Sequence, residues 1–218
     1  GKVLNEQPLM RNVLADLVLE SEGSIALTMR VARALDHRAD EHEDFLVRLC
    51  TAVGKYWICK RTPGHAYESM ECIGGSGVME DSPFPRLFRE SPVNAIWEGS
   101  GNVQCLDVLR AMQKTPPVVG AFFAELAKAR GANTTLDRYT AALQKEFGDL
   151  GDLEYRARDV VDRMALALQA ALLVQHAPAS VADAFCASRL GASGHHNYGA
   201  LPRGVDCEGI IARATPKA

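Results

Sequence analysis

Apolar residues recur at steps of three and four positions along most of the chain, with charged residues between them. This pattern predicts one long amphipathic helix over residues 9–35 and a second from about residue 45 to residue 73. The pair Pro63-Gly64 should kink or interrupt the second helix, because proline lacks the amide donor that an α-helix needs. The glycines of residues 74–77 then end it.

Residues 78–94 contain three prolines and no helical spacing long enough for a helix, so we expect an ordered loop with a short helical turn near residues 85–88. Helical spacing resumes after Gly101 and stops at Pro116-Pro117, the best candidate for a domain or subdomain boundary. No segment shows the alternation of a half-buried strand, and the sequence therefore predicts an all-α, antiparallel helical bundle. Further helices are predicted over residues 118–130, 136–147, 153–174, 180–190 and 205–213.

The composition is that of an ordinary globular chain, because 218 residues with 47% hydrophobic residues can bury a sizeable core. Its 24 basic and 27 acidic residues give a net charge of −3, which argues against a surface built throughout for nucleic acid. No window approaches the roughly 18 apolar residues of a membrane span, and the first residues contain neither a start Met nor a signal core. We expect a piece of a longer, soluble protein of the cytoplasm or mitochondrial matrix that is not secreted.

Cysteines and histidines lack the spacing of a metal site, and no metal is predicted. The six cysteines form no CxxC pair, and we expect them to be reduced, mostly structural thiols. His195 and His196 follow a glycine- and serine-containing stretch, where a surface pair is the simpler interpretation. Tyr56 and Trp57 are expected in the core or at a subunit interface.

Two short segments carry residues suited to chemistry. Gly74, Gly75 and Gly77 would let the backbone approach a ligand closely, although a glycine-rich helix terminator explains the same pattern. Glu98 stands between a bulky tryptophan and a flexible glycine, at the start of a helix whose first amides are free. A carboxylate held against an apolar wall can serve as a base that removes a carbon-bound proton, whereas a solvated glutamate at a helix start is the simpler alternative.

Three runs in this region together resemble the C-terminal helical domain of acyl-CoA dehydrogenases: residues 73–75, 89–102 and 105–110. In that family a GG-x-G loop precedes an arginine-bearing segment and an aromatic-Glu-Gly-Thr/Ser turn. The last two runs are similar, more narrowly, to the alkylation-response (AidB-like) branch. The resemblance implies a four-helix-bundle domain over residues 1–115 and a helical C-terminal extension over residues 116–218 that packs on it.

The resemblance also implies roles for single residues. Glu98 matches the catalytic base that takes the α-proton of an acyl-CoA while the β-hydrogen passes as hydride to the flavin. Arg110 matches an arginine that lies near this glutamate. Six residues match contacts to FAD, which the family shares with an N-terminal domain, a central β-domain and a neighbouring subunit: Glu71, Gly74, Gly75, Ser76, Ser100 and Asn102.

As partners, the resemblance implies a homo-oligomer, dimer or tetramer, and an acyl-CoA thioester as substrate; no membrane is expected. The isolated chain should be inactive and retain no FAD. Trp97, Asn102 and Glu71 depart from the usual Tyr, Gln and Gln, which counts against efficient dehydrogenation of ordinary acyl-CoA thioesters. The narrower resemblance implies an alternative of the alkylation-response type: a flavoprotein with little dehydrogenase activity that binds DNA. Against DNA, residues 131–218 contain nine basic and ten acidic residues, so no concentration of positive charge is predicted there.

Overall fold

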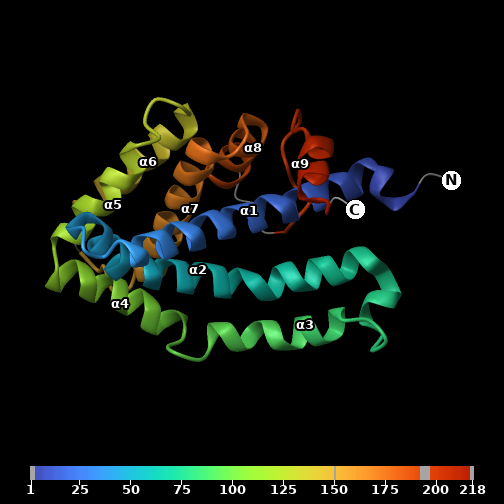
Figure 1. Cartoon of the computed structure of the whole chain (residues 1–218), viewed down its shortest axis with the longest axis horizontal. Coiled ribbons are helices and arrows are strands. Elements are labelled where there is room, and N and C mark those ends of the chain that lie inside the picture. Colours follow the sequence, from blue (N-terminus) through green and yellow to red (C-terminus); the bar gives the residue numbers. More distant parts are fainter. Residues whose placement is uncertain (1–2, 150, 192–196, 217–218) are drawn as a thin grey trace.

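Two long antiparallel helices, α1 (Pro8–Asp36) and α2 (Glu41–Ile73), run side by side through the middle of the molecule (Figure 1). The structure is a computed structural model that describes residues 3–149, 151–191 and 197–216. Over these residues it contains helices and turns and no strand. The prediction of an all-α helical protein is confirmed.

The sequence between the two long helices explains the sharp turn. Asp40 lies in extended conformation before α2, and its carboxylate accepts hydrogen bonds from the backbone amides of His42 at 2.8 Å and Glu43 at 3.3 Å. A side chain that caps free amides in this way fixes where a helix begins. The chain therefore reverses within four residues and returns along α1.

Pro63 lies inside α2, which runs without interruption from Glu41 to Ile73, so the predicted interruption is wrong. A proline within a helix removes one backbone hydrogen bond and costs about 3 kcal/mol. The buried residues on both sides, Tyr56 before it and Met70 after it, hold the two halves in one helix.

The segment after α2 is more helical than its prolines suggested. A 3₁₀ turn over Gly74–Val78 leads to α3 (Phe84–Glu90), a second 3₁₀ turn over Ser91–Ala95, and then α4 (Gly101–Lys114). The expected single turn near residues 85–88 is thus a seven-residue helix. Prolines are tolerated there because they stand in its first turn, where the missing amide has no helical partner.

Five further helices follow Pro116: α5 (Pro117–Ala127), α6 (Thr134–Glu146), α7 (Ala157–His176), α8 (Ala179–Arg189) and α9 (Cys207–Ala214). Figure 1 shows α6 to α9 along the α1 side of the long pair, whereas α3 and α4 lie along the α2 side. Each of these helices falls within a few residues of a predicted segment. Helix α5 packs on α2, and both α7 and α9 pack on α1.

One hydrophobic core crosses the Pro-Pro pair at 116–117 without a break. Leu27 and Val53 of the long helices belong to the same buried cluster as Phe122, Met164 and Leu168. Helices also approach closely at Gly23 of α1, where an added Cβ would lie 2.9 Å from the ring of Phe185. The helices after residue 116 therefore complete the interior rather than form a separate globule.

Two buried clusters of ion pairs add to this joint, and no sequence pattern predicted them. In the first, Arg30 of α1 contacts Glu43 of α2 at 2.6 Å and Glu125 of α5 at 2.7 Å. In the second, Glu20 of α1 accepts from Arg61 of α2 at 3.0 Å and lies 3.4 Å from Arg189 of α8. Because the central groups Arg30 and Glu20 are buried, removing their partners would leave a charge without compensation.

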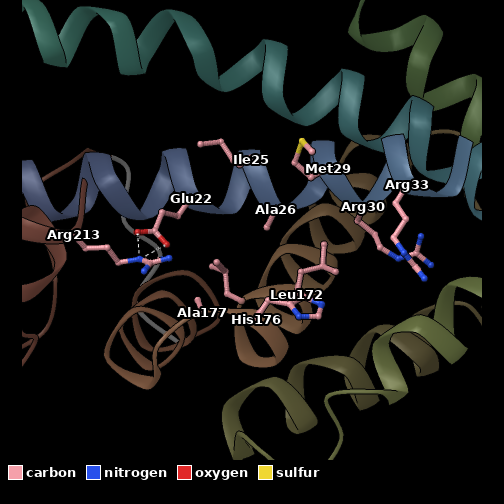
Figure 2. Close-up of a pocket in the computed structure, with 11 residues that line it drawn as sticks. Glu22, Ile25, Ala26, Met29, Arg30, Arg33, Leu172, His176, Ala177 and Arg213 are labelled. Atoms are coloured by element: carbon pink, nitrogen blue, oxygen red, sulfur yellow. Dashed lines mark hydrogen bonds and ion pairs between the residues drawn. The ribbon is translucent and has the colours of Figure 1, made fainter. Parts of the chain in front are cut away.

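A hollow of about 460 Å³ lies between α1, α7 and α9 (Figure 2). In Figure 2 Arg213 faces Glu22 at one end, with an ion pair of 2.9 Å, and Arg33 and His176 lie toward the other end. Its apolar wall comes from Ile25, Ala26, Met29, Leu172, Leu173 and Ala177. None of the predicted site residues lines this hollow.

The two adjacent aromatic residues of α2 lie in or against the core, as the sequence predicts. Tyr56 is 6% exposed and belongs to the core, and Trp57 packs half-buried against it with the Arg61 guanidinium 5.6 Å from its ring centre. All six cysteines are free thiols. His195 and His196 lie outside the described residues. No helix in the described part is long and apolar enough to cross a bilayer.

Candidate functional site

The glycine-rich segment forms the end of α2 and the turn that follows it. Gly74 adopts a φ of 73°, a left-handed conformation that suits glycine, and its amide donates to the Glu71 carbonyl. An added Cβ at Gly77 would lie 2.3 Å from the Met70 carbonyl oxygen, so the turn can close only around a glycine. The prediction that glycine ends this helix is confirmed.

The outer side of this turn is open. Gly74, Gly75 and Ser76 are exposed, and a Cβ added to either glycine would meet no atom of the described residues within 4 Å. Glu71 is exposed on the last turn of α2, and its carboxylate raises the pKa of the Tyr67 phenol through a hydrogen bond. The four predicted cofactor residues of this segment therefore lie together on one accessible surface.

Glu98 lies on the second segment, in the turn that connects Ala95 to α4. Its φ of 53° is left-handed, which only Asp152 shares among the non-glycine residues that the structure describes. The neighbouring side chains Ile96 and Trp97 are 67% and 60% exposed. No described residue forms an ion pair with the Glu98 carboxylate, which is exposed.

Backbone groups of this turn are held by two side chains that sequence reasoning missed. Lys55 of α2 donates to the carbonyls of Trp97 and Gly99, and Gln104 of α4 donates to those of Glu98 and Gly99. Lys55 directly precedes the core position Tyr56 in α2, but no spacing in the sequence indicates which carbonyls its side chain would reach.

Helix α4 begins directly after the turn because Gly101 allows a close approach to α2. A Cβ added there would lie 2.8 Å from Cε of Lys60 and 3.3 Å from the Tyr56 ring. Ser100 occupies the N-cap position without a capping hydrogen bond from its side chain. The first amides of α4 are thus left for another acceptor, which is the usual property of anion sites at helix starts.

Asn102 and Arg110 both already have partners within the chain. The side-chain oxygen of Asn102 accepts from Arg158 of α7 at 2.9 Å, which leaves its amide nitrogen as a donor. Arg110 contacts Asp107 at 3.2 Å, and Arg48 of α2 holds the same carboxylate at 2.8 Å. Hydrogen bonding to Arg48 is the main reason why the pKa of Asp107 is lowered.

The structure does not bring Arg110 into contact with Glu98. Arg110 lies nine residues beyond Gly101, a rise of about 14 Å along the helix axis, and no ion pair joins it to Glu98. The described residues also contain no group of three side chains suited to hold a metal ion. The site residues therefore fall into two accessible surfaces, the glycine turn and the Glu98 turn, on either side of α3.

The helical fold is that of the C-terminal domain of one enzyme family. The family "Acyl-CoA dehydrogenase, C-terminal domain" matches residues 1–113, and the chain belongs to the acyl-CoA dehydrogenase family. The resemblance seen in the sequence is confirmed.

Individual proteins that resemble this chain belong to the same family. AidB of Escherichia coli (strain K12), named as a candidate acyl-CoA dehydrogenase, is 40% identical over 186 residues, which are 85% of this chain and 34% of AidB. Acyl-CoA dehydrogenase family member 11 of Caenorhabditis elegans is 33% identical over 141 residues, 63% of this chain and 23% of the relative. The structure of Caenorhabditis elegans ACDH-11 in complex with C11-CoA superposes with a TM-score of 0.80 at 26% identity, covering 89% of this chain and 38% of that one. The chain spans about a third or less of the length of the two sequence relatives.

Proposed function

We propose that this chain is the C-terminal part of an FAD-dependent oxidoreductase that acts on the CH–CH bond of an acyl-CoA thioester, with Glu98 as the base. The Glu98 turn carries the proposal. It presents an exposed carboxylate, without an ion pair to any described residue, at the start of α4 and in the aromatic-Glu-Gly sequence of the family. Such a carboxylate can remove the acidic proton next to a thioester carbonyl.

The residues present also fit FAD. The open backbone at Gly74 and Gly75, with the exposed Ser76 hydroxyl and Glu71, offers a surface that a diphosphate and its adenosine can approach. The uncapped amides of α4, with Ser100 and the free amide nitrogen of Asn102, would hold a second part of the cofactor. When bound, FAD accepts the hydrogen that leaves the β-carbon as hydride.

In this proposal Arg110 is a charged residue of α4 that does not contact Glu98. Asp107 holds its guanidinium, and Arg48 holds Asp107 in turn, so that the positive charge of Arg110 has a defined position on α4.

We assign residues 1–115 to the family bundle that carries these groups and residues 116–218 to a helical extension packed on it.

The experiment replaces Glu98 in the full-length protein. A positioned general base contributes a factor of about 10² to 10⁴ to the rate, so we expect Glu98→Gln to lose thioester turnover by that factor and to keep its flavin. Glu90→Gln, an exposed glutamate of α3 without a described partner, is the control and should retain full turnover. Wild-type turnover in Glu98→Gln would overturn the proposal.

Binding of DNA, the alternative of the alkylation-response type, finds no support in the charges of the extension. Its described arginines mostly contact groups of the protein: Arg156, Arg163, Arg189 and Arg213 each pair with a carboxylate, and Arg158 donates to Asn102. Affinity for DNA depends on basic side chains that neutralise phosphates and so release the counterions condensed on the DNA. A salt-dependent gel shift with the full-length protein would favour DNA binding over this interpretation.

We also propose that the protein assembles as a homo-oligomer, a dimer or a tetramer. Three apolar side chains near the Glu98 turn support this: Ile96 at 67%, Trp97 at 60% and Val103 at 51% exposure, a cluster typical of surfaces that another chain covers. Light scattering after size-exclusion chromatography should give a dimer or tetramer for the full-length protein, and a monomer would contradict it.

The 218-residue chain purified alone should show no flavin spectrum.

A further inference from the structure

Three consecutive carbonyl groups around Glu98 are held by two side chains from two different helices. Nζ of Lys55 lies 2.7 Å from the Trp97 carbonyl oxygen and 2.6 Å from that of Gly99. Nε2 of Gln104 lies 3.0 Å from the Glu98 carbonyl oxygen and 3.2 Å from that of Gly99. Every backbone carbonyl from residue 97 to residue 99 thus accepts a hydrogen bond from a side chain outside the turn.

The conformation that these hydrogen bonds hold is a strained one. A non-glycine residue in the left-handed region costs on the order of 1–2 kcal/mol, and Glu98 has a φ of 53°. Such a conformation persists only where the surroundings determine it. The hydrogen bonds of Gln104 also require a glycine at position 99, because an added Cβ there would lie 2.7 Å from Nε2 of Gln104 and would displace that amide.

The ammonium of Lys55 is directed at backbone carbonyls rather than at a carboxylate. Its ammonium donates to the carbonyls on either side of Glu98, and no ion pair joins it to the Glu98 side chain in the described part of the chain. A direct ion pair would stabilise the charged carboxylate and weaken it as a base. Contacts to the backbone fix the direction of the side chain without that penalty.

We infer that Lys55 and Gln104 are positioning residues that hold the backbone of the Glu98 turn so that the carboxylate points at the proton it removes. Lys55 is anchored half-buried on α2, and Gln104 stands in the first turn of α4. The two helices thereby determine the turn jointly. This inference rests on the proposed function of Glu98 as a base.

The test uses the full-length protein with Lys55→Met and Gln104→Met, which preserve side-chain length and remove the donors. Misplacing a reactive group by about 1 Å can cost 10²-fold in rate, so we expect kcat to fall about 10- to 100-fold in each variant, with KM within about twofold. Lys55→Arg should recover part of kcat. The control is Lys145→Met, an exposed lysine of α6 whose side chain makes no described contact, which should leave kcat unchanged.

A second measurement follows the turn independently of turnover. Hydrogen exchange of the amides in residues 97–104 should become faster in Lys55→Met and Gln104→Met, and remain as in the wild type in Lys145→Met. Unchanged exchange in both donor-free variants would overturn the inference. A variant that does not fold leaves its partner, on the other helix, to decide the same question.

Glu98→Gln, measured in parallel, separates this inference from the proposed function. If Glu98→Gln is inactive while Lys55→Met and Gln104→Met keep wild-type kcat, the base remains assigned and the positioning role is wrong. If Glu98→Gln keeps wild-type turnover, the function of Glu98 as a base fails, and with it the inference that rests on it. An inactive Glu98→Gln with impaired kcat and faster exchange in both donor-free variants supports the inference.

Discussion

The Arg30 guanidinium meets the Glu125 carboxylate in two parallel hydrogen bonds, Nε to Oε1 at 2.7 Å and Nη2 to Oε2 at 2.9 Å. Arg30 is 8% and Glu125 2% exposed, and Glu43 binds the other edge of the same guanidinium. Because Arg30 belongs to α1 and Glu125 to α5, this buried pair joins the helices before and after the Pro-Pro pair.

Replacing Glu125 should destabilise the protein strongly. Glu125→Gln removes one of the two negative charges that surround a buried arginine, and breaking such a pair costs about 3–5 kcal/mol. Urea unfolding of the 218-residue chain measures this loss. Arg38→Ala, which breaks the exposed pair with Asp44, should cost less than about 1 kcal/mol. Equal losses in the two variants would show that burial does not determine the strength of the Glu125 cluster.

Acid should weaken the same cluster in a defined range of pH. Burial alone would raise the pKa of Glu125, but hydrogen bonds from Arg30 and Lys128 outweigh it and lower the pKa from 4.5 to about 2. A carboxyl group whose pKa is lower in the folded state stabilises that state fully above its unfolded value, and the stabilisation is lost as the pH falls toward the folded value. We therefore expect the free energy of unfolding to drop between about pH 5 and pH 2 by on the order of 2–3 kcal/mol more in wild type than in Glu125→Gln. Parallel pH profiles would contradict this linkage.

The pattern of apolar residues was sufficient to predict most helices, because each long helix has one buried face. The pattern failed at the prolines, whose effect on a helix depends on where in the helix they lie. Pro63 lies inside a long, well-packed helix, and Pro83 and Pro85 lie at a helix start, where proline is tolerated. The buried partners of Arg30 and Glu20 could not be predicted, since their contacts lie in helices distant in the sequence.

Two glycines of the same turn should respond differently to alanine. Gly77→Ala would place a Cβ 2.3 Å from the Met70 carbonyl oxygen, so the backbone must shift, at a cost of about 1–3 kcal/mol. The Cβ of Gly75→Ala would meet no atom of the described part of the chain within 4 Å, so this variant should leave the free energy of unfolding of the 218-residue chain nearly unchanged. Thermal unfolding of both variants checks this, and a destabilised Gly75→Ala would show that the outer side of the turn is not open.

The same pair also tests the cofactor assignment. In the full-length protein, Gly75→Ala should lower the flavin content although the fold is intact, because a methyl group would stand on the surface proposed for FAD. Flavin released by denaturation, measured by its absorption relative to protein, gives the content. Stoichiometric flavin in Gly75→Ala would remove this position from the proposed contact.

The start of α2 depends on a single carboxylate. Asp40→Ala removes the acceptor for the amides of His42 and Glu43 and should lower the free energy of unfolding by about 1 kcal/mol. Asp40→Asn keeps an acceptor oxygen and should lose much less. Urea unfolding of the two variants provides the comparison, and an equal loss would mean that the charge rather than the hydrogen bonds matters.

For the proposed site, the sequence motif indicates Glu98 and the glycine turn, but it does not indicate the two side chains, Lys55 and Gln104, that hold the Glu98 turn. Lys55 lies 43 positions before Glu98, and its contacts are to backbone carbonyls, which every residue type possesses. A hydrogen bond to a carbonyl leaves no complementary side chain in the sequence. Only the arrangement of α2 and α4 in space reveals it.

The shared core across residues 116–117 has a consequence for how such a gene can change. A stop codon after residue 115 would remove Phe122, Met164 and Leu168 and leave Leu27 and Val53 facing water. Insertions and losses of whole modules succeed in evolution where few contacts cross the boundary, and many cross this one. In this chain, we therefore expect substitutions on the buried face of α1 to be tolerated only where α7 can accommodate them.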